Sequence, residues 1–204
     1  MIATKEHWEK IFATKSEHDV SWFQPYPKTS VGFVKLFNLP PESNIIDIGG
    51  GDSHLVDALI EKGYKNLYVL DIAENALQRA KERLGDKADS VHWIASDILD
   101  FKPDMKFDFW HDRAAFHFLT TETNIDKYVE IAENSIRPGG YLILGTFSEK
   151  GPDQCSGLEI KQYNEASMSY RFERKFERIK CISEDHLTPF NTTQNFLFCS
   201  FKKK

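Results

Sequence analysis

Residues 44–54 constrain the fold of this chain more than any other stretch. An apolar run ends there at Asp47, a turn of three successive glycines follows, and a helical pattern begins directly after the turn. A second apolar run ends at Asp71, twenty residues past the last of these glycines. A strand, a glycine turn, a helix and a second strand in this order can hold an adenosine-bearing cofactor at the carboxyl edge of a parallel sheet. The glycines are Gly49, Gly50 and Gly51.

The details of the glycine turn favour one class of cofactor. The dinucleotide fingerprint G-x-G-x-x-G requires a third glycine where this chain has His54, so the chain departs from that fingerprint. The pattern Asp-x-Gly-x-Gly that begins at Asp47 instead resembles the glycine-loop motif of class I S-adenosylmethionine (SAM) methyltransferases. Carboxylates at Asp47 and Asp52 would repel a pyrophosphate and suit the ammonium group of SAM. We therefore expect SAM rather than a dinucleotide.

The resemblance implies a set of contacts to this cofactor. In the resembled family, the acid after the second strand binds the ribose hydroxyls, which is the role we expect for Asp71. The pair after the third strand flanks the adenine there, which places Asp97 near the exocyclic amine. An alternative is that Asp71 and Asp97 are only helix N-caps, since both precede helical or turn segments. The residues expected to bind the cofactor are Asp47, Gly49, Gly50, Gly51, Asp71, Ile72, Asp97, Ile98, Trp22 and His111.

The rest of the chain alternates predicted strands and helices. No helix separates the last two strands, which implies that they form an antiparallel pair. Together with the resemblance, this predicts an α/β, Rossmann-like seven-stranded sheet in the order 3-2-1-4-5-7-6, with strand 7 antiparallel and helices on both faces. The predicted strands cover 44–48, 66–70, 91–95, 107–110, 141–147, 177–183 and 194–201, and the predicted helices cover 6–12, 30–37, 53–62, 73–84, 123–136 and 164–176.

The chain is expected to form a single methyltransferase domain over residues 1–204, because its 204 residues fit one domain of ordinary size. Residues 1–43 precede the sheet and are predicted to form a helical or lid segment. Within them, the stretch 20–27 is too rich in proline and aromatic residues to be regular. Two roles remain open for its aromatic side chains. They could close over the sulfonium as cation–π partners, or anchor the segment to the sheet; these side chains are Trp22, Phe23 and Tyr26.

The residues that follow the fourth strand are the candidates for chemistry. Ligands of open α/β sheets bind where the strand order reverses, so His111, Asp112 and Arg113 should lie near the transferred methyl group. His111 would act as a general base or merely wall the cofactor. Asp112 could orient His111 or bind a substrate cation, and Arg113 could bind a substrate acid through two hydrogen bonds. The structural alternative is an ion pair between Asp112 and Arg113.

Composition excludes several classes of partner. No apolar stretch reaches about eighteen residues and the N-terminus lacks the apolar core of a signal peptide, so we expect a cytoplasmic protein without a membrane partner. The net charge of -5 and the isoelectric point near 5.8 argue against nucleic acid. The three cysteines, at wide spacings, are expected to be reduced and structural. No spacing resembles a metal site. A monomer or a homodimer is expected.

The acceptor of the methyl group is less constrained, because the motif specifies the cofactor and not the substrate. The run 112–115 and the early Trp8 resemble small-molecule thiol and thiopurine methyltransferases, whereas Trp8 and the run 21–23 also resemble a group of protein-lysine methyltransferases. The short chain, with no added recognition domain, favours a small acceptor. A protein-lysine methyltransferase is the first alternative, and a non-catalytic SAM-binding or scaffold protein is the second.

Overall fold

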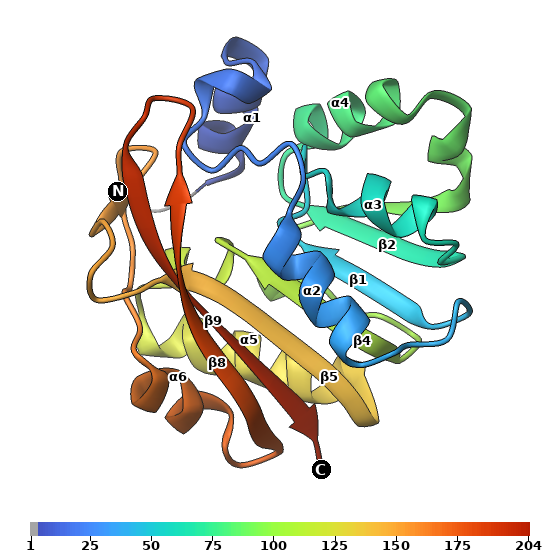
Figure 1. Cartoon of the computed structure of the whole chain (residues 1–204), viewed down its shortest axis with the longest axis vertical. Helices are drawn as coiled ribbons and strands as arrows, with labels where there is room; N and C mark the ends of the chain where they lie inside the picture. The colour runs from blue at the N-terminus through green and yellow to red at the C-terminus, as the bar shows by residue number, and fades with distance from the viewer. Residues whose placement is uncertain (1–3) are drawn as a thin grey trace.

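The computed structural model describes residues 4–204, which are built around one central sheet (Figure 1). Its strands lie in the order β3-β2-β1-β4-β5-β9-β8. β9 is antiparallel to both of its neighbours, and the other pairs are parallel. The predicted order and the reversal of the last strand are thus confirmed. The strands are β1 (Asn44–Ile48), β2 (Asn66–Asp71), β3 (Val91–Ala95), β4 (Phe107–Arg113), β5 (Ile136–Phe147), β8 (Phe176–Leu187) and β9 (Thr193–Lys203).

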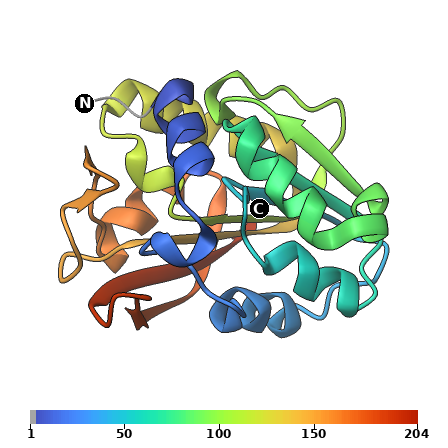
Figure 2. The same cartoon turned by 90° about the horizontal axis from the view of Figure 1, so that it is seen from above.

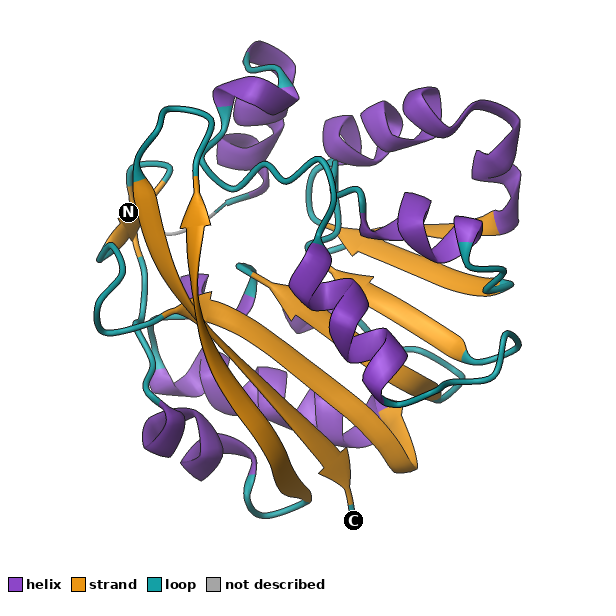
Figure 3. Ribbon diagram, viewed as in Figure 1, coloured by secondary structure: helices purple, strands orange, loops and turns teal. Residues whose placement is uncertain are grey.

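Helices cover both faces of the sheet, as predicted (Figures 2 and 3). Side chains alternate between the two faces along each strand, so every central strand contributes apolar side chains to a hydrophobic core on each face. Ile45 and Phe109 face α2, α3 and α4, whereas Ile46 and Trp110 face α5 and α6. The helices are α1 (Lys5–Thr14), α2 (Lys28–Leu36), α3 (Leu55–Glu61), α4 (Glu74–Leu84), α5 (Glu122–Ser135) and α6 (Glu165–Phe172).

Helix α1 lies beyond the carboxyl edge of the sheet, next to the start of α4 (Figure 1). The carboxylate of Glu9 accepts hydrogen bonds from the backbone N–H groups of Glu74, at 2.8 Å, and Asn75, at 3.1 Å. An acid at this position satisfies free N–H groups and suits the positive end of the α4 dipole. The hydrogen bonds of Glu9 to the start of α4 thus hold α1 over the edge where ligands of such sheets bind. Within residues 4–204, no helix is long and apolar enough to cross a membrane.

Several predicted boundaries are wrong. β4 continues to Arg113 instead of ending at Trp110, and β5 begins at Ile136 instead of Tyr141. The stretch between the predicted strand 141–147 and the predicted helix 164–176 contains a short hairpin of β6 (Gln154–Cys155) and β7 (Leu158–Glu159). The helix predicted over 164–176 is shorter, because its last residue belongs to β8. The extension of β4 has the largest consequence, since the alternation of side chains then sends successive polar residues to opposite faces.

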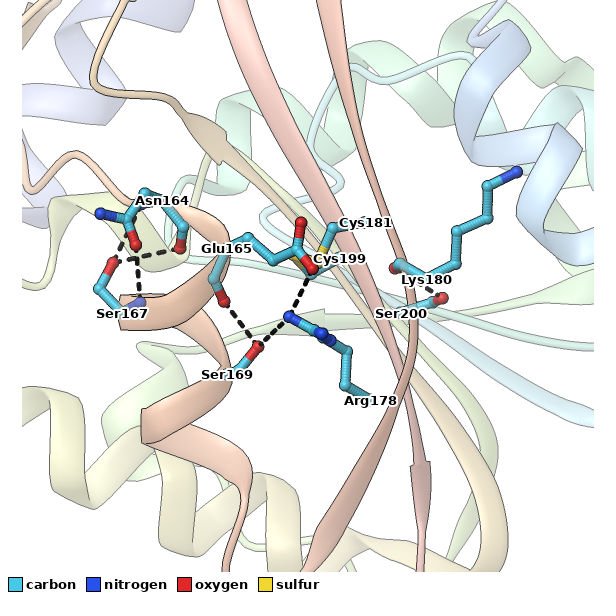
Figure 4. Close-up of a disulfide and its surroundings, with 9 residues drawn as sticks. All are labelled: Asn164, Glu165, Ser167, Ser169, Arg178, Lys180, Cys181, Cys199 and Ser200. Carbon is cyan, nitrogen blue, oxygen red and sulfur yellow. Dashed lines mark hydrogen bonds and ion pairs between the residues drawn. A yellow bond between two sulfur atoms is a disulfide. The ribbon is translucent and has the colours of Figure 1, made fainter.

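The expectation of three reduced cysteines is also wrong. Cys181 and Cys199 form a disulfide, and only Cys155 is a free, buried thiol within the described part of the chain. Antiparallel pairing of β8 with β9 sets Cys181 directly opposite Cys199. Figure 4 shows this bridge beside the side chains of α6 and β8, where Arg178 forms an ion pair with Glu165. The disulfide therefore joins the last two strands on the α6 side of the sheet.

Candidate functional site

Two adjoining cavities lie at the carboxyl edge of the sheet. The larger has a volume of about 200 Å³ and the smaller about 70 Å³. Both are lined by Gly49, Phe12, Trp22 and Arg113, so these residues mark the junction. Nine of the ten residues predicted to bind the cofactor line one cavity or both, and the tenth, Gly51, lines neither. The nine are Asp47, Gly49, Gly50, Asp71, Ile72, Asp97, Ile98, Trp22 and His111.

The glycine turn is shaped by close approach as well as by conformation. Gly49 and Gly51 adopt positive φ values of 63° and 33°, which side chains rarely tolerate. A Cβ atom on Gly51 would lie 2.6 Å from Oδ2 of Asp71, and one on Gly49 would lie 2.7 Å from Cβ of Ala115. The turn therefore leaves bare main chain between the ends of β1, β2 and β4. This cradle fits a cofactor laid against the backbone.

Asp71, at the end of β2, is buried and forms no ion pair with a residue of the described range 4–204. Its Oδ1 accepts a hydrogen bond of 2.8 Å from the backbone N–H of Ala73. The N-cap residue of α4 is Ala73, so the alternative that Asp71 is only a helix N-cap is wrong. Burial raises the pKa of Asp71 to about 7, and the charges of Asp47 and Glu9 add to this rise. The carboxylate also lines the larger cavity. Hydroxyl donors from a ribose would supply the hydrogen bonds that this charge lacks.

Asp97 and Ile98 line the same cavity, beyond the end of β3. Oδ1 of Asp97 accepts a hydrogen bond of 2.8 Å from the backbone N–H of Leu99 and caps the short 3₁₀ helix Ile98–Asp100. The N-cap alternative therefore describes a contact that exists. It does not exclude the cofactor contact, because the cap uses one of the two carboxylate oxygens.

A chain of three enclosed side chains lies at the smaller cavity. Nδ1 of His111 lies 2.6 Å from Oδ1 of Asp47, and its Nε2 lies 2.8 Å from Oγ of Ser30. Asp47 and His111 face each other because they are register partners in β1 and β4. The ring of His111 is 2 % exposed and both nitrogens are hydrogen-bonded within the protein. This geometry favours a positioning role for His111 over a general base.

Asp112 points to the face of the sheet opposite His111. The sequence predicted it to lie after the strand and near the transferred methyl group. Its Oδ2 accepts a hydrogen bond of 2.7 Å from the hydroxyl of Tyr128, which in turn accepts one of 3.0 Å from Trp110. Its Oδ1 accepts from the backbone N–H groups of Ala115 and Phe116. Burial raises the pKa of Asp112 to about 6, against the opposing effect of Tyr128. Asp112 is fully enclosed and lines neither cavity.

Arg113 returns to the cavity face and forms no ion pair with Asp112 or any other residue of 4–204. Its Nη1 donates to the carbonyl of Trp22 at 2.9 Å, and its guanidinium lies 4.6 Å from the ring centroid of Phe196. Nε and Nη2 are shielded from solvent and have no hydrogen-bond partner. Burial lowers the pKa of Arg113 to about 10, so the side chain stays charged at neutral pH.

The N-terminal segment forms an aromatic roof, which we define as Trp8, Phe12 and Trp22. The ring of Trp22 lies 6.0 Å from that of Trp8 and 6.4 Å from that of Phe12. The roof is held from below, because Nε2 of His186 donates to the carbonyl of Ser21 at 2.7 Å. These contacts anchor the N-terminal segment and leave Trp22 in the walls of both cavities, and the contact of its ring with the sulfonium stays a prediction.

Other residues depart from the sequence-based expectations. Asp52 was expected to offer its charge to the cofactor, but its carboxylate forms an ion pair with Arg83 and lies 3.7 Å from Arg79. Tyr26, expected in the lid, is 48 % exposed and lines neither cavity. His186 and Phe12 were not singled out as site residues. The apolar face of the first helix was the only signal for Phe12, and no local pattern marks His186.

Comparison with known proteins agrees with this geometry. A family model described as a methyltransferase domain matches residues 40–194, which is most of the chain. The chain belongs to this methyltransferase family. A SAM-dependent methyltransferase from Anabaena variabilis shares the fold, with a TM-score of 0.77 at 14% identity over 100% of this chain and 96% of that one. The methyltransferase family and the Rossmann-like fold predicted from the sequence are thereby confirmed.

Curated relatives of this methyltransferase differ in what they act on. A mouse protein named eEF1A lysine and N-terminal methyltransferase is 25% identical over 151 residues, 70% of this chain and 21% of its own length. A malonyl-[acyl-carrier protein] O-methyltransferase from Anoxybacillus flavithermus is 25% identical over 147 residues, 72% of this chain and 54% of its own length. The chain thus spans about a fifth of the mouse relative and about half of the bacterial one.

Proposed function

We propose that this protein transfers a methyl group from SAM to a nucleophilic atom of a small-molecule acceptor. The observation that carries the proposal is the cavity of about 200 Å³ beneath the aromatic roof, with Asp71 and Arg113 both in its wall. When bound, SAM supplies an electrophilic methyl group, which moves to the acceptor as the C–S bond breaks and the sulfonium becomes a neutral thioether.

The residues of the cradle divide between the parts of the cofactor. Asp71 would accept hydrogen bonds from the ribose, and Ile72 and Ile98 would flank the adenine beside Asp97. The bare main chain of the glycine turn would support the amino-acid end, where Asp47 would attract the ammonium group. The burial of Asp71 in the wall of the larger cavity, and the place of Gly49, which has no side chain, in the walls of both cavities, support this arrangement.

Alignment and exclusion of water are the main tasks of the protein in a methyl displacement. Holding two reactants in line can supply about 7–11 kcal/mol of the reduction in the barrier. The aromatic roof covers the cavity from the side of α1, and the charge of the sulfonium suits the faces of its rings. His111 holds Asp47 in place through its hydrogen bond and takes no proton from the acceptor in this proposal.

The roof also favours a small acceptor over a protein side chain. A lysine on a folded protein must reach the methyl group through a wide mouth, whereas here side chains of α1 and Trp22 form one wall of the cavity. The name of the mouse relative supports the protein-lysine alternative, and the name of the Anoxybacillus relative supports an acyl acceptor. A non-catalytic SAM-binding protein would share the cradle but lack turnover.

A transfer assay separates these three functions. Tritiated SAM is incubated with the protein and, in parallel, with a panel of small metabolites and with a cell lysate separated by size. We expect label in the small-molecule fraction. Label in protein bands alone would contradict a small acceptor, and binding of SAM without transfer to any fraction would favour the non-catalytic alternative.

A further inference from the structure

We propose that Arg113 forms a carboxylate-binding site at the junction of the two cavities, with the enclosed His117 beside it, and that the acceptor therefore carries an acid group. The inference rests on the proposed function and names the chemical class of its substrate. It is carried by hydrogen-bond donors that the protein encloses but does not satisfy.

One side of the Arg113 guanidinium has the geometry to bind a carboxylate through two hydrogen bonds. Nη1 is occupied by the carbonyl of Trp22, and the two nitrogens without a partner, Nε and Nη2, are the pair on one side of the guanidinium. Their N–H groups are parallel and match the two oxygens of a carboxylate. A cation enclosed without an anion is unfavourable unless a ligand completes the pair. The two unpartnered nitrogens of Arg113 therefore suit a ligand carboxylate that accepts one hydrogen bond from each.

His117 is a second enclosed side chain with an unsatisfied donor. The backbone N–H of Phe147 donates to its Nδ1 at 3.3 Å, so the proton of the neutral ring is on Nε2. Burial and the charge of Arg113 lower the pKa of His117 to about 3, which keeps the ring neutral. Nε2 is enclosed and has no partner. His117 lines neither cavity, so its N–H dipole adds to the positive potential near Arg113 and makes no direct contact with a ligand in the cavities.

Aromatic contacts connect the two residues. The guanidinium of Arg113 lies over Phe196, whose ring centroid is 4.8 Å from that of Phe147. The ring of Phe147 is in turn 4.8 Å from that of His117. These packed rings hold both side chains in place. The site is therefore preorganised by β4, β5 and β9.

The acids near Arg113 are committed elsewhere. The charges of Glu184 and Asp47 raise the pKa of Arg113, but neither forms an ion pair with it. Glu184 accepts a hydrogen bond from Thr29, and Asp47 is bonded to His111. Burial raises the pKa of the Cys155 thiol, also in the cavity wall, to about 11, so it stays neutral. The anion must then come from a ligand.

SAM itself has a carboxylate, so the first experiment asks which molecule supplies the acid. S-adenosylhomocysteine (SAH) and 5′-methylthioadenosine, which lacks the amino-acid end, are titrated calorimetrically into wild-type protein and Arg113→Gln. We expect Arg113→Gln to leave both affinities within about twofold, since the cofactor does not use this fork. A loss of about tenfold for SAH alone would assign Arg113 to the cofactor and overturn the proposal.

The second experiment uses matched acceptor probes. Benzoate with benzamide, and hexanoate with hexanamide, are titrated into the SAH-loaded protein. We expect each acid to bind at least about tenfold more tightly than its amide, and this preference to vanish in Arg113→Gln. His117→Phe should reduce the preference without removing it, and Arg113→Lys should restore part of it as a point charge without the fork.

The outcomes separate this inference from the proposed function. Equal binding of acids and amides, or an acid preference that survives Arg113→Gln in a folded protein, would contradict the site. No detectable binding of either acid would also contradict it. Acid binding without methyl transfer to any small molecule would leave the site in place and reject the function. Transfer to neutral acceptors that is unchanged in Arg113→Gln would keep the function and reject the site.

Discussion

Oδ1 of Asp47 and Nδ1 of His111 lie 2.6 Å apart in neighbouring strands, and both side chains are almost fully enclosed. The pair links the end of β1, where the cofactor cradle begins, to β4, where the acceptor site begins. Ser30 extends the link to α2 through Nε2 of the same ring. The orientation of Asp47 therefore depends on residues from three separate elements.

Removing the ring of His111 should leave the buried carboxylate of Asp47 without its hydrogen-bond partner. We expect His111→Ala to lower the free energy of unfolding by about 2–4 kcal/mol, because an enclosed carboxylate loses its partner. His111→Asn should lose less, since its amide N–H can replace Nδ1. Urea unfolding at neutral pH measures both. In a transfer assay, the pH–rate profile of His111→Asn should match that of the wild type, and loss of the limb in which the rate rises from acidic pH would instead restore the general-base role.

Asp71 should destabilise the free protein above neutral pH. Its folded pKa of about 7 exceeds its ordinary value of 3.8, so the folded state holds the proton more tightly and stability falls as the pH rises from about 4 to 7. Asp71→Asn removes this loss and should raise the unfolding free energy at pH 8 by about 1–3 kcal/mol. Near pH 4 the two proteins should differ little. Thermal unfolding at both pH values checks this, and equal stability at pH 8 would count against it.

Asp112 and Tyr128 should support the fold and leave the cofactor site alone. Tyr128→Phe removes the donor to Asp112 and the acceptor for Trp110, so we expect a loss of about 1–3 kcal/mol in unfolding free energy. The dissociation constant for SAH should stay within about twofold of the wild-type value. A stable variant with much weaker SAH binding would place Asp112 in the site after all.

The disulfide should be visible chemically and thermodynamically. Alkylation of the unfolded, unreduced protein should modify one thiol, that of Cys155, and three after reduction. Cys181 and Cys199 are separated by 18 positions, and closing a loop of this length stabilises a protein by about 3 kcal/mol. Cys181→Ser should lose about that amount in urea unfolding. Three reactive thiols before reduction would contradict the bridge.

The sequence could predict those parts of the site whose residues lie close together along the chain. The strand, the glycine turn and the acid at Asp71 lie within thirty positions, and their periodicity and turn chemistry are local signals. The order of the strands followed from the resemblance, and the reversal of the last strand also followed from the missing helix before it. Both agree with the structure.

The parts that sequence could not predict depend on partners far along the chain. β4 runs on through His111 and Asp112 because Asp47 and Tyr128 satisfy these polar side chains, and no local pattern reveals those contacts. The predicted strand ended at residue 110, so Asp112 was expected on the same side as His111 and Arg113. In the structure β4 continues and Asp112 points to the other face of the sheet. The disulfide was missed for a similar reason, since the pairing of Cys181 depends on the register of β8 with β9.

The account rests on SAM lying against the glycine turn with its ribose on Asp71. The most direct measurement is a calorimetric titration of SAH into wild-type protein, Asp71→Ala and, as a matched control, the exposed Asp86→Ala. We predict that Asp71→Ala weakens SAH by at least about tenfold, or 1.4 kcal/mol, that Asp86→Ala changes nothing, and that NAD does not compete. Undiminished SAH affinity in a folded Asp71→Ala variant, or displacement of SAH by NAD, would contradict the account.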